Sequence, residues 1–315
     1  MHAKAILIGL LSATGAIAAT YPDATPLQAR DSKQVLGKDR TLRIMALGAS
    51  ITYGQGSDKT GGYRQELVRR LKEGKNKVEM VGEREHGDFT ENKVEGWPGK
   101  RIDEILKDQM ASVEKNKPAI VLLNVGTNDA VQNKDIDKAG DRYEDLVKEI
   151  LKRGGPRTVV LASTLVHNRN KDAEERVKKI NTQIERAVNK LIKEKKRVVL
   201  VNMFDKGPNP DKKDGESEYH DDIHPNERGY KKMAEVWEDA IKEADRRKLL
   251  AGPGGKVKKA ADKTKQKLKK MADKPKKKLS KQKSKMLDEI RKIIQDEFKK
   301  VEDAIKDLKK DIKKN

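Results

Sequence analysis

Five short apolar runs that alternate with helical patterns constrain the fold more than any other feature of this 315-residue chain. The strongest run, AIVLLNV at residues 119–125, has the nearly unbroken apolar character of a strand that is buried on both faces. The other strands are expected at residues 43–47, 78–81, 158–162 and 197–203. Helices are expected at residues 63–72, from residue 102 onward, and at residues 143–151, 173–194 and 229–247. This alternation predicts a three-layer α/β/α fold with a five-stranded parallel sheet.

The two ends of the chain differ from this middle part in composition. Residues 1–19 combine a basic start, an apolar run and a small-residue end, which is typical of a secretory signal peptide. The apolar run is shorter than the ~20 residues needed to cross a bilayer, so secretion is favoured over a membrane anchor. We expect an N-terminal arm at residues 20–40, the α/β/α domain at 41–250, a Gly/Pro hinge at 251–255 and a Lys-rich helical extension at 256–315.

The extension carries most of the net charge of +21, since residues 252–315 contain 24 Lys and Arg but only 10 Asp and Glu. From Leu287 to Ile312, apolar residues recur at steps of three and four, which predicts one apolar stripe along a helix. A solvated extension, an anchor to an anionic polymer or lipid surface, and self-association all fit this composition. Specific nucleic-acid binding is not expected, because Phe298 is the only aromatic residue of the extension.

The first predicted strand runs into Gly48, Ala49 and Ser50, which places a hydroxyl just beyond the carboxyl end of a buried strand. Ligands of parallel α/β sheets bind at these strand ends. A lone Gly-x-Ser is most often a turn, but this chain also supplies a base and an acid. His224 can accept the serine proton, and Asp221, three residues earlier, can hold the other ring nitrogen. Because the chain has no cysteine, thiol catalysis and disulfide bonds are excluded.

A serine hydrolase also needs hydrogen-bond donors aimed at the oxyanion of its tetrahedral intermediate. The backbone N–H groups of Ser50 and Gly99 and the side chain of Asn128 are the candidates. Glycine at position 99 lets the backbone approach a ligand closely. Asn128 follows the AIVLLNV strand, where it can also serve as the N-cap of the next helix. Trp97 fits either the core or a wall of the acyl pocket.

Only one histidine after the predicted signal peptide, His224, has an aspartate three residues before it and a proline after it. His220 is its main rival as the base. Asp221, Asp222, His220 and His224 form a dense group of metal-ligating types, but no second set stands elsewhere in the sequence. The sequence therefore predicts neither a metal site nor a cofactor.

Several segments stand in order along the chain: LRIMALGASITYG from residue 42, GGYR from 61, VEGWPGKRID from 94, LLNVGTNDA from 122 and DDIHP from 221. Over residues 42–237 the chain resembles the SGNH hydrolases, also called GDSL-like lipases and esterases. That family is named for the Ser, Gly, Asn and His that match Ser50, Gly99, Asn128 and His224. The chain is most similar to secreted fungal members related to acetyl xylan esterases, of the carbohydrate esterase class. The resemblance implies the SGNH version of the flavodoxin-like fold and ester hydrolysis without a cofactor.

Two positions depart from the family pattern. Ala49 stands where the family name has Asp, so any supporting role of that Asp is lost. Asp222 stands where many relatives carry glycine, which leaves the D-x-x-H spacing intact but adds a carboxylate beside the candidate base.

The sequence thus predicts a secreted serine esterase with catalytic Ser50, Asp221 and His224. Small acyl groups are expected, because aromatic residues make up only 3% of the chain and no long apolar lid is present. Deacetylation of a plant polysaccharide is implied by the resemblance alone. The alternative is a catalytically idle domain whose basic amphipathic tail binds an anionic surface or self-associates.

Overall fold

In the computed structural model, the described part of the chain comprises residues 35–38, 40–57, 59, 61–210, 217–251 and 283–314. The predicted signal peptide, most of the N-terminal arm, the predicted hinge from residue 252 and the extension up to residue 282 lie outside it. What the sequence predicts for those segments therefore stays a prediction. Among the described helices, none combines the length and apolar character that a bilayer crossing needs.

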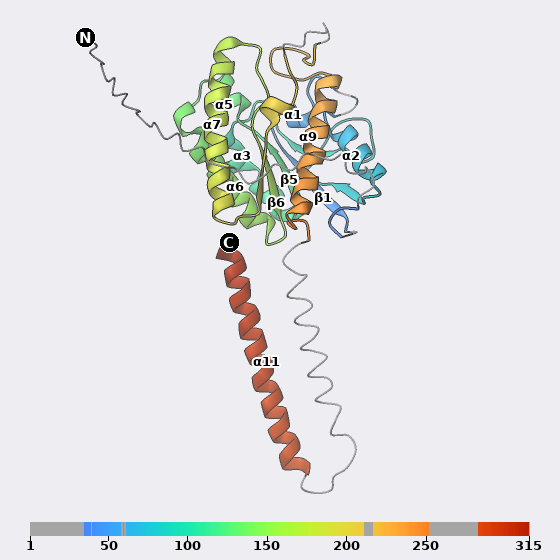
Figure 1. Cartoon of the computed structure of the whole chain (residues 1–315), viewed down its shortest axis with the longest axis vertical. Coiled ribbons are helices and arrows are strands. Elements are labelled where there is room, and N and C mark those ends of the chain that lie inside the picture. The colour runs from blue at the N-terminus through green and yellow to red at the C-terminus, as the bar shows by residue number, and fades with distance from the viewer. Residues whose placement is uncertain are drawn as a thin grey trace, which may run out of the picture. The chain divides into compact units, whose positions relative to one another are not determined.

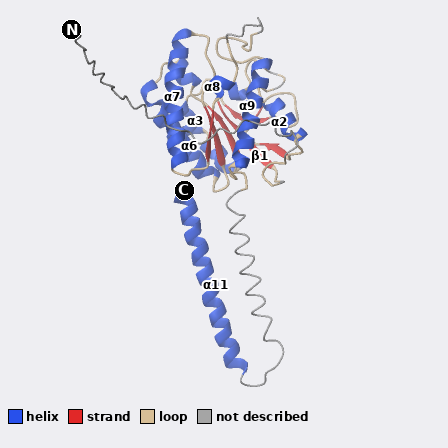
Figure 2. Cartoon of the chain, viewed as in Figure 1, coloured by secondary structure: helices blue, strands red, loops and turns tan. Residues whose placement is uncertain are grey.

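A sheet of seven strands forms the middle layer of the domain (Figures 1 and 2). The strands are β1 (Leu42–Gly48), β2 (Val78–Met80), β3 (Arg84–Glu85), β4 (Lys93–Gly96), β5 (Ile120–Asn124), β6 (Val159–Ser163) and β7 (Val198–Val201). Their order is β3-β4-β1-β5-β6-β7, with β2 also paired to β1, and every pair except β3–β4 is parallel. β2 pairs with the start of β1 and β4 with its last two residues, so the end of β1 lies between β4 and β5.

The predicted α/β/α fold is confirmed, and the five predicted strands form β1, β2, β5, β6 and β7. The predicted sheet was nevertheless too small and too regular, because it omitted β3 and β4, whose pairing is antiparallel. The reason lies in their sequences. β3 has two polar residues, and β4 reads KVEG, so neither contains the apolar run by which the other strands are found.

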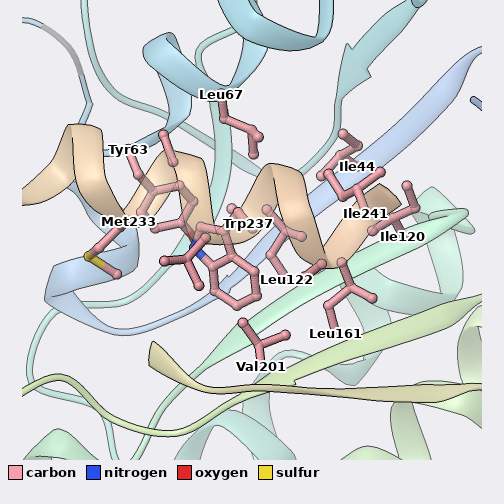
Figure 3. Close-up of a cluster of buried hydrophobic side chains, with 14 of the residues drawn as sticks. Ile44, Tyr63, Leu67, Ile120, Leu122, Leu161, Val201, Met233, Trp237 and Ile241 are labelled. Carbon is pink, nitrogen blue, oxygen red and sulfur yellow. The ribbon is translucent and has the colours of Figure 1, made fainter. Parts of the chain in front are cut away.

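Helices cover both faces of the sheet, as its alternating side chains require. Ile44 and Ala46 of β1 pack on the face of α2 (Arg64–Glu73) and α9 (Glu227–Arg246). Figure 3 shows this core around the fully buried Trp237. Met45 and Leu47 face the opposite core. That core is shared with α3 (Ile102–Asp108), α4 (Met110–Asn116), α6 (Ala139–Gly154) and α7 (Lys171–Lys193).

The remaining elements are short, except for the last helix. Four of them follow strand ends or precede α6: α1 (Ser50–Tyr53), α5 (Thr127–Val131), a 3-10 helix at Ile136–Lys138 and α8 (Met203–Lys206). The helix α11 (Lys283–Lys314) is separate from the domain in sequence. Within it, Ile293 and Phe298 are 59% and 46% exposed.

Candidate active site

Ser50 lies at the first turn after β1, where the chain leaves the sheet. Gly48 ends the strand in a place that only glycine can occupy, since a Cβ there would lie 2.0 Å from the carbonyl oxygen of Asn124. Ala49 then precedes α1, and Ser50 is the first helical residue. The Ser50 side chain is thus held at the carboxyl edge of the sheet with 7% of the residue exposed.

His224 belongs to a loop that is closed on itself just before α9. The backbone of His220 donates to the carbonyl oxygen of His224 at 2.8 Å, and Tyr219 and Pro225 form an isolated bridge. Asn226 ends the loop as the N-cap of α9, because its side chain accepts from the backbone N–H groups of the first turn. These bonds fix the loop from which the imidazole projects.

The structure brings Ser50, His224 and Asp221 into one hydrogen-bonded chain. His224 Nε2 lies 2.9 Å from Ser50 Oγ, and His224 Nδ1 lies 2.8 Å from Asp221 Oδ2. The other oxygen, Asp221 Oδ1, accepts from the backbone N–H groups of Ile223 and His224, both at 2.7 Å. An ionised Asp221 can only accept, so Nδ1 carries the proton and Nε2 is left to accept from the serine hydroxyl.

The charge state of Asp221 suits this arrangement. Partial burial raises its pKa, but hydrogen bonds from the His224 ring and from the backbone of His224 and Ile223 outweigh burial and hold the pKa below its ordinary value. The carboxylate is therefore ionised at neutral pH.

The three predicted oxyanion donors lie at the ends of three adjacent strands. Ser50 follows β1, Gly99 follows β4 and Asn128 follows β5; Gly48 is in register with both Gly96 and Asn124. Within the described residues, the N–H groups of Ser50 and Gly99 donate no hydrogen bond to the protein. Gly99 has φ of +81°, a conformation that favours glycine, and a Cβ there would meet nothing within 4 Å.

Asn128 does not cap the helix that follows β5. The N-cap of α5 is Gly126, and Asn128 is the second residue of the helix. Its side-chain Nδ2 donates to the carbonyl oxygen of Lys100 at 2.9 Å, one residue beyond Gly99. One N–H of the amide is thus used to join the two loops, and the second is left for a ligand.

The other histidines in the described part of the chain have different surroundings. His86 forms a hydrogen bond from Nδ1 to the carbonyl oxygen of Tyr53, and its ring stacks on the Tyr53 ring. His167 Nδ1 lies 2.7 Å from a carboxylate oxygen of Glu174. His220 is exposed, and it is His224, not His220, that bonds Ser50. The exposed Asp222 uses its carbonyl oxygen to accept from Arg169 N. No group of three or more potential metal ligands is assembled among the residues described.

Trp97 and Ala49 flank the candidate site. Trp97 is half-buried, and its indole N–H donates to the fully buried Glu95 at 2.8 Å. The Arg84 guanidinium lies over the rings of both Trp97 and Tyr53, at 4.8 and 4.5 Å from their centroids. Ala49 is buried, with 6% exposed. Trp97 is therefore anchored from two sides beside Gly99.

Sequence reasoning missed several buried polar residues that support these loops. Arg64 of the GGYR segment is fully buried and donates to the carbonyl oxygens of Tyr53, His86 and Asn92, and burial lowers its pKa to about 10. Asp129 is also fully buried and is paired with Arg142. Arg64 lies in the GGYR segment and Asp129 in LLNVGTNDA, but their partners are distant in sequence and give no local signal.

Fold and geometry together define an α/β/α protein with a Ser-His-Asp chain at the carboxyl ends of its strands. The model of the GDSL-like Lipase/Acylhydrolase family matches residues 46–232. This match covers more than half of the chain, so the chain belongs to that family, a family of carboxylic ester hydrolases. The predicted family resemblance is confirmed.

Individual relatives agree with this family. A multidomain esterase of Ruminococcus flavefaciens is 26% identical over 230 residues, or 64% of this chain, which spans only 28% of that protein. A solved family 3 carbohydrate esterase of Clostridium thermocellum has 24% identity and a TM-score of 0.56. The match covers 65% of this chain and 100% of the esterase chain. Another from Talaromyces cellulolyticus has 19% identity and a TM-score of 0.53, with coverages of 65% and 99%. At these identities the structures support the fold.

Proposed function

We propose that this chain is a serine esterase in which Ser50 is the nucleophile, His224 the general base and acid, and Asp221 the residue that orients His224. The observation that carries the proposal is the continuous hydrogen-bonded chain from Ser50 Oγ through the imidazole to Asp221, at 2.9 and 2.8 Å. These are the distances and the order of roles that activation of a serine requires.

The reaction then follows in two halves. Ser50 Oγ attacks the acyl carbon while its proton moves to His224 Nε2, and the tetrahedral oxyanion is bound by the N–H groups of Ser50 and Gly99 and by Asn128 Nδ2. Collapse of the intermediate gives the Nε2 proton to the departing alcohol and leaves an ester on Ser50. Water, deprotonated by His224, attacks this ester in the second half, and Ser50 regains its proton as the acid product leaves.

The substrate class we propose is a short acyl ester, with acetyl groups on a plant polysaccharide as the specific case. The support is the similarity to two family 3 carbohydrate esterases and to a multidomain esterase, together with the low aromatic content of the chain. Secretion is part of the same proposal, supported by the composition of residues 1–19. N-terminal sequencing of protein recovered from culture medium tests the cleavage near residue 19.

Hydrolysis of p-nitrophenyl acetate, butyrate and octanoate tests the esterase proposal, with Ser50→Ala as the blank. Turnover that falls with acyl length and disappears in the variant supports it. Release of acetate from acetylated xylan, measured on the same two proteins, tests the polysaccharide. Equal turnover by the wild type and the blank would remove the catalytic proposal and leave the idle-domain alternative.

For the extension we propose a second function, binding to an anionic lipid surface. Two features favour this partner: the apolar stripe of α11, on which Phe298 is exposed, and the Lys-rich composition of residues 252–282. Binding to a polysaccharide would leave the apolar stripe without a partner, and self-association through the stripe would leave the excess of lysine without one. An anionic bilayer surface uses both.

Vesicle sedimentation tests this partner with the full chain, a chain ending at Ala251, and an Ile294→Ser/Phe298→Ser variant. Binding to phosphatidylserine-containing vesicles, absent with phosphatidylcholine alone and lost on truncation, is expected; the double variant should bind more weakly, and salt should weaken all binding. Equal vesicle binding by the double variant and the full wild-type chain would show that the stripe is not used and would overturn the proposal.

A further inference from the structure

The loops that carry two of the candidate oxyanion donors are joined by side-chain hydrogen bonds. Asn128 Nδ2 donates to Lys100 O at 2.9 Å, and Asp129 Oδ2 accepts from Ile102 N at 3.1 Å. Gln132 adds a longer bond, to Gly99 O at 3.3 Å, from an exposed position. The first two bonds come from neighbouring residues of α5 and reach two points of the same turn after Gly99.

Asp129 is the buried member of this junction. The residue is completely inaccessible, and its Oδ1 accepts from Arg142 on α6 at 2.8 Å. Arg142 also donates to the carbonyl oxygens of Lys134 and Asp135, both at 3.0 Å, so the guanidinium is itself held in place. Removal of one partner from a buried ion pair of this kind is strongly destabilising, because it leaves the other charge buried and unpaired.

Ile102 is the first residue of α3, and its N–H is one of the groups that a helix leaves without an internal partner. A carboxylate at this end also interacts favourably with the helix dipole. Asp129 therefore fixes where α3 begins, three residues after Gly99. Asn128, which precedes Asp129 on α5, donates from Nδ2 to Lys100 O in the same turn.

We propose that Asp129 is a positioning residue for the oxyanion site, which sets the separation between the Gly99 N–H and Asn128 Nδ2. Its carboxylate bonds Ile102 and Arg142, and within the described part of the chain it has no hydrogen bond to Ser50, His224 or Asp221. Its effect on the reaction passes through the two donors alone. This inference rests on the proposed function of Ser50, Gly99 and Asn128.

The consequence is specific to the chemical step. Donors displaced by a fraction of an ångström bind the ground-state ester nearly as before but bind the oxyanion less well, so kcat falls and KM is unchanged. Removal of one such donor costs about 10²- to 10³-fold in rate. Asp129→Asn, which keeps the shape and removes the charge, is expected to lower kcat by about 10- to 100-fold.

The experiment compares kcat and KM for p-nitrophenyl acetate in wild type, Asp129→Asn, Asn128→Ala and the double variant. Rates are expressed per active site titrated with a fluorophosphonate, so that unfolded protein does not count. Glu238→Gln is the matched control, because Glu238 is 6% exposed and paired with Arg70 at 2.6 Å on the α2–α9 side of the sheet. Both charge-removing variants are expected to lower the melting temperature, and only Asp129→Asn to lower kcat.

The double variant separates positioning from a general structural role. If Asp129 acts by setting the separation between the two donors, its effect should be small once Asn128 Nδ2 is absent. Adding Asp129→Asn to Asn128→Ala should then cost about threefold or less, far below its effect alone. Full additivity, or an Asp129→Asn kcat equal to that of wild type, would overturn the inference. If Asp129→Asn does not fold, Arg142→Gln loosens the same junction from the other side; it should lower kcat several-fold at constant KM, and an unchanged kcat would count against the inference. Equal turnover by wild type and Ser50→Ala would instead overturn the proposed function itself.

Discussion

On one side of Ser50, His224 and Asp221 lie three residues apart and are joined within a single loop, where Asp221 keeps 44% of its side chain exposed. On the other side, Gly99 and Asn128 come from separate loops that are joined by the fully buried Asp129 and its partner Arg142. The acid-base side is built from local contacts near solvent, and the donor side from long-range contacts in the interior. The two sides should therefore respond differently to substitution, to pH and to changes elsewhere.

The largest effect should come from the atom that the two sides share. Ser50→Ala removes the nucleophile, and we expect kcat for p-nitrophenyl acetate to fall by about 10⁴- to 10⁶-fold. Fold and melting temperature should change little, because the side chain is small and its one described side-chain bond is to His224. Steady-state kinetics with a thermal melt check both; substantial residual turnover would mean that Ser50 is not the nucleophile.

Asp221→Asn tests the acid-base side, and kcat should fall by about 10²- to 10⁴-fold because an amide can favour the wrong imidazole tautomer. The variant also tests stability. Since the folded pKa of Asp221 is lowered, its contribution is present at neutral pH and is lost as pH falls through that lowered pKa. The difference in the free energy of unfolding between wild type and variant should thus shrink toward zero in acid. A difference that grows in acid would contradict the assigned bonds.

Gly99→Ala tests the donor side with a smaller change. A Cβ at Gly99 meets nothing within 4 Å, so the cost comes from φ of +81°, about 1–2 kcal/mol for a residue other than glycine. The turn should relax toward negative φ and tilt the N–H, which lowers kcat by about tenfold at constant KM. Gly155→Ala, with φ of +93° and equally open surroundings after α6, is the matched control and should destabilise without changing kcat. Equal kinetics in both variants would remove Gly99 from the donor set.

Truncation after Ala251 should have the smallest effect on either side. Among the described residues, the two cores of the domain are assembled from residues 36–250, so kcat on a soluble ester should stay within about twofold and the melting temperature should not change. Enzyme assays and calorimetry on the full and shortened chains make the comparison. A fall in kcat would mean that the extension takes part in the site.

The same local-versus-distant difference decides what the sequence can predict. The strands β1, β5, β6 and β7 were found from the sequence because each has an apolar run. The pair Asp221 and His224 was found because the two residues have a short spacing. β4 was missed although it carries the chain toward Gly99, because its pairing depends on β1 and not on its own residues. Glu95, Asp129 and Arg142 were missed as supporting residues for the same reason: their roles come from partners that only the fold brings together.

The proposed mechanism requires Ser50 to carry the acyl group, and labelling with a fluorophosphonate, which mimics the tetrahedral intermediate, is the measurement that tests this requirement. We predict one label per chain, located on Ser50 by peptide mass spectrometry, with esterase turnover lost in proportion to labelling and no labelling of Ser50→Ala. A label on another residue, or full turnover in chains labelled at Ser50, would contradict it.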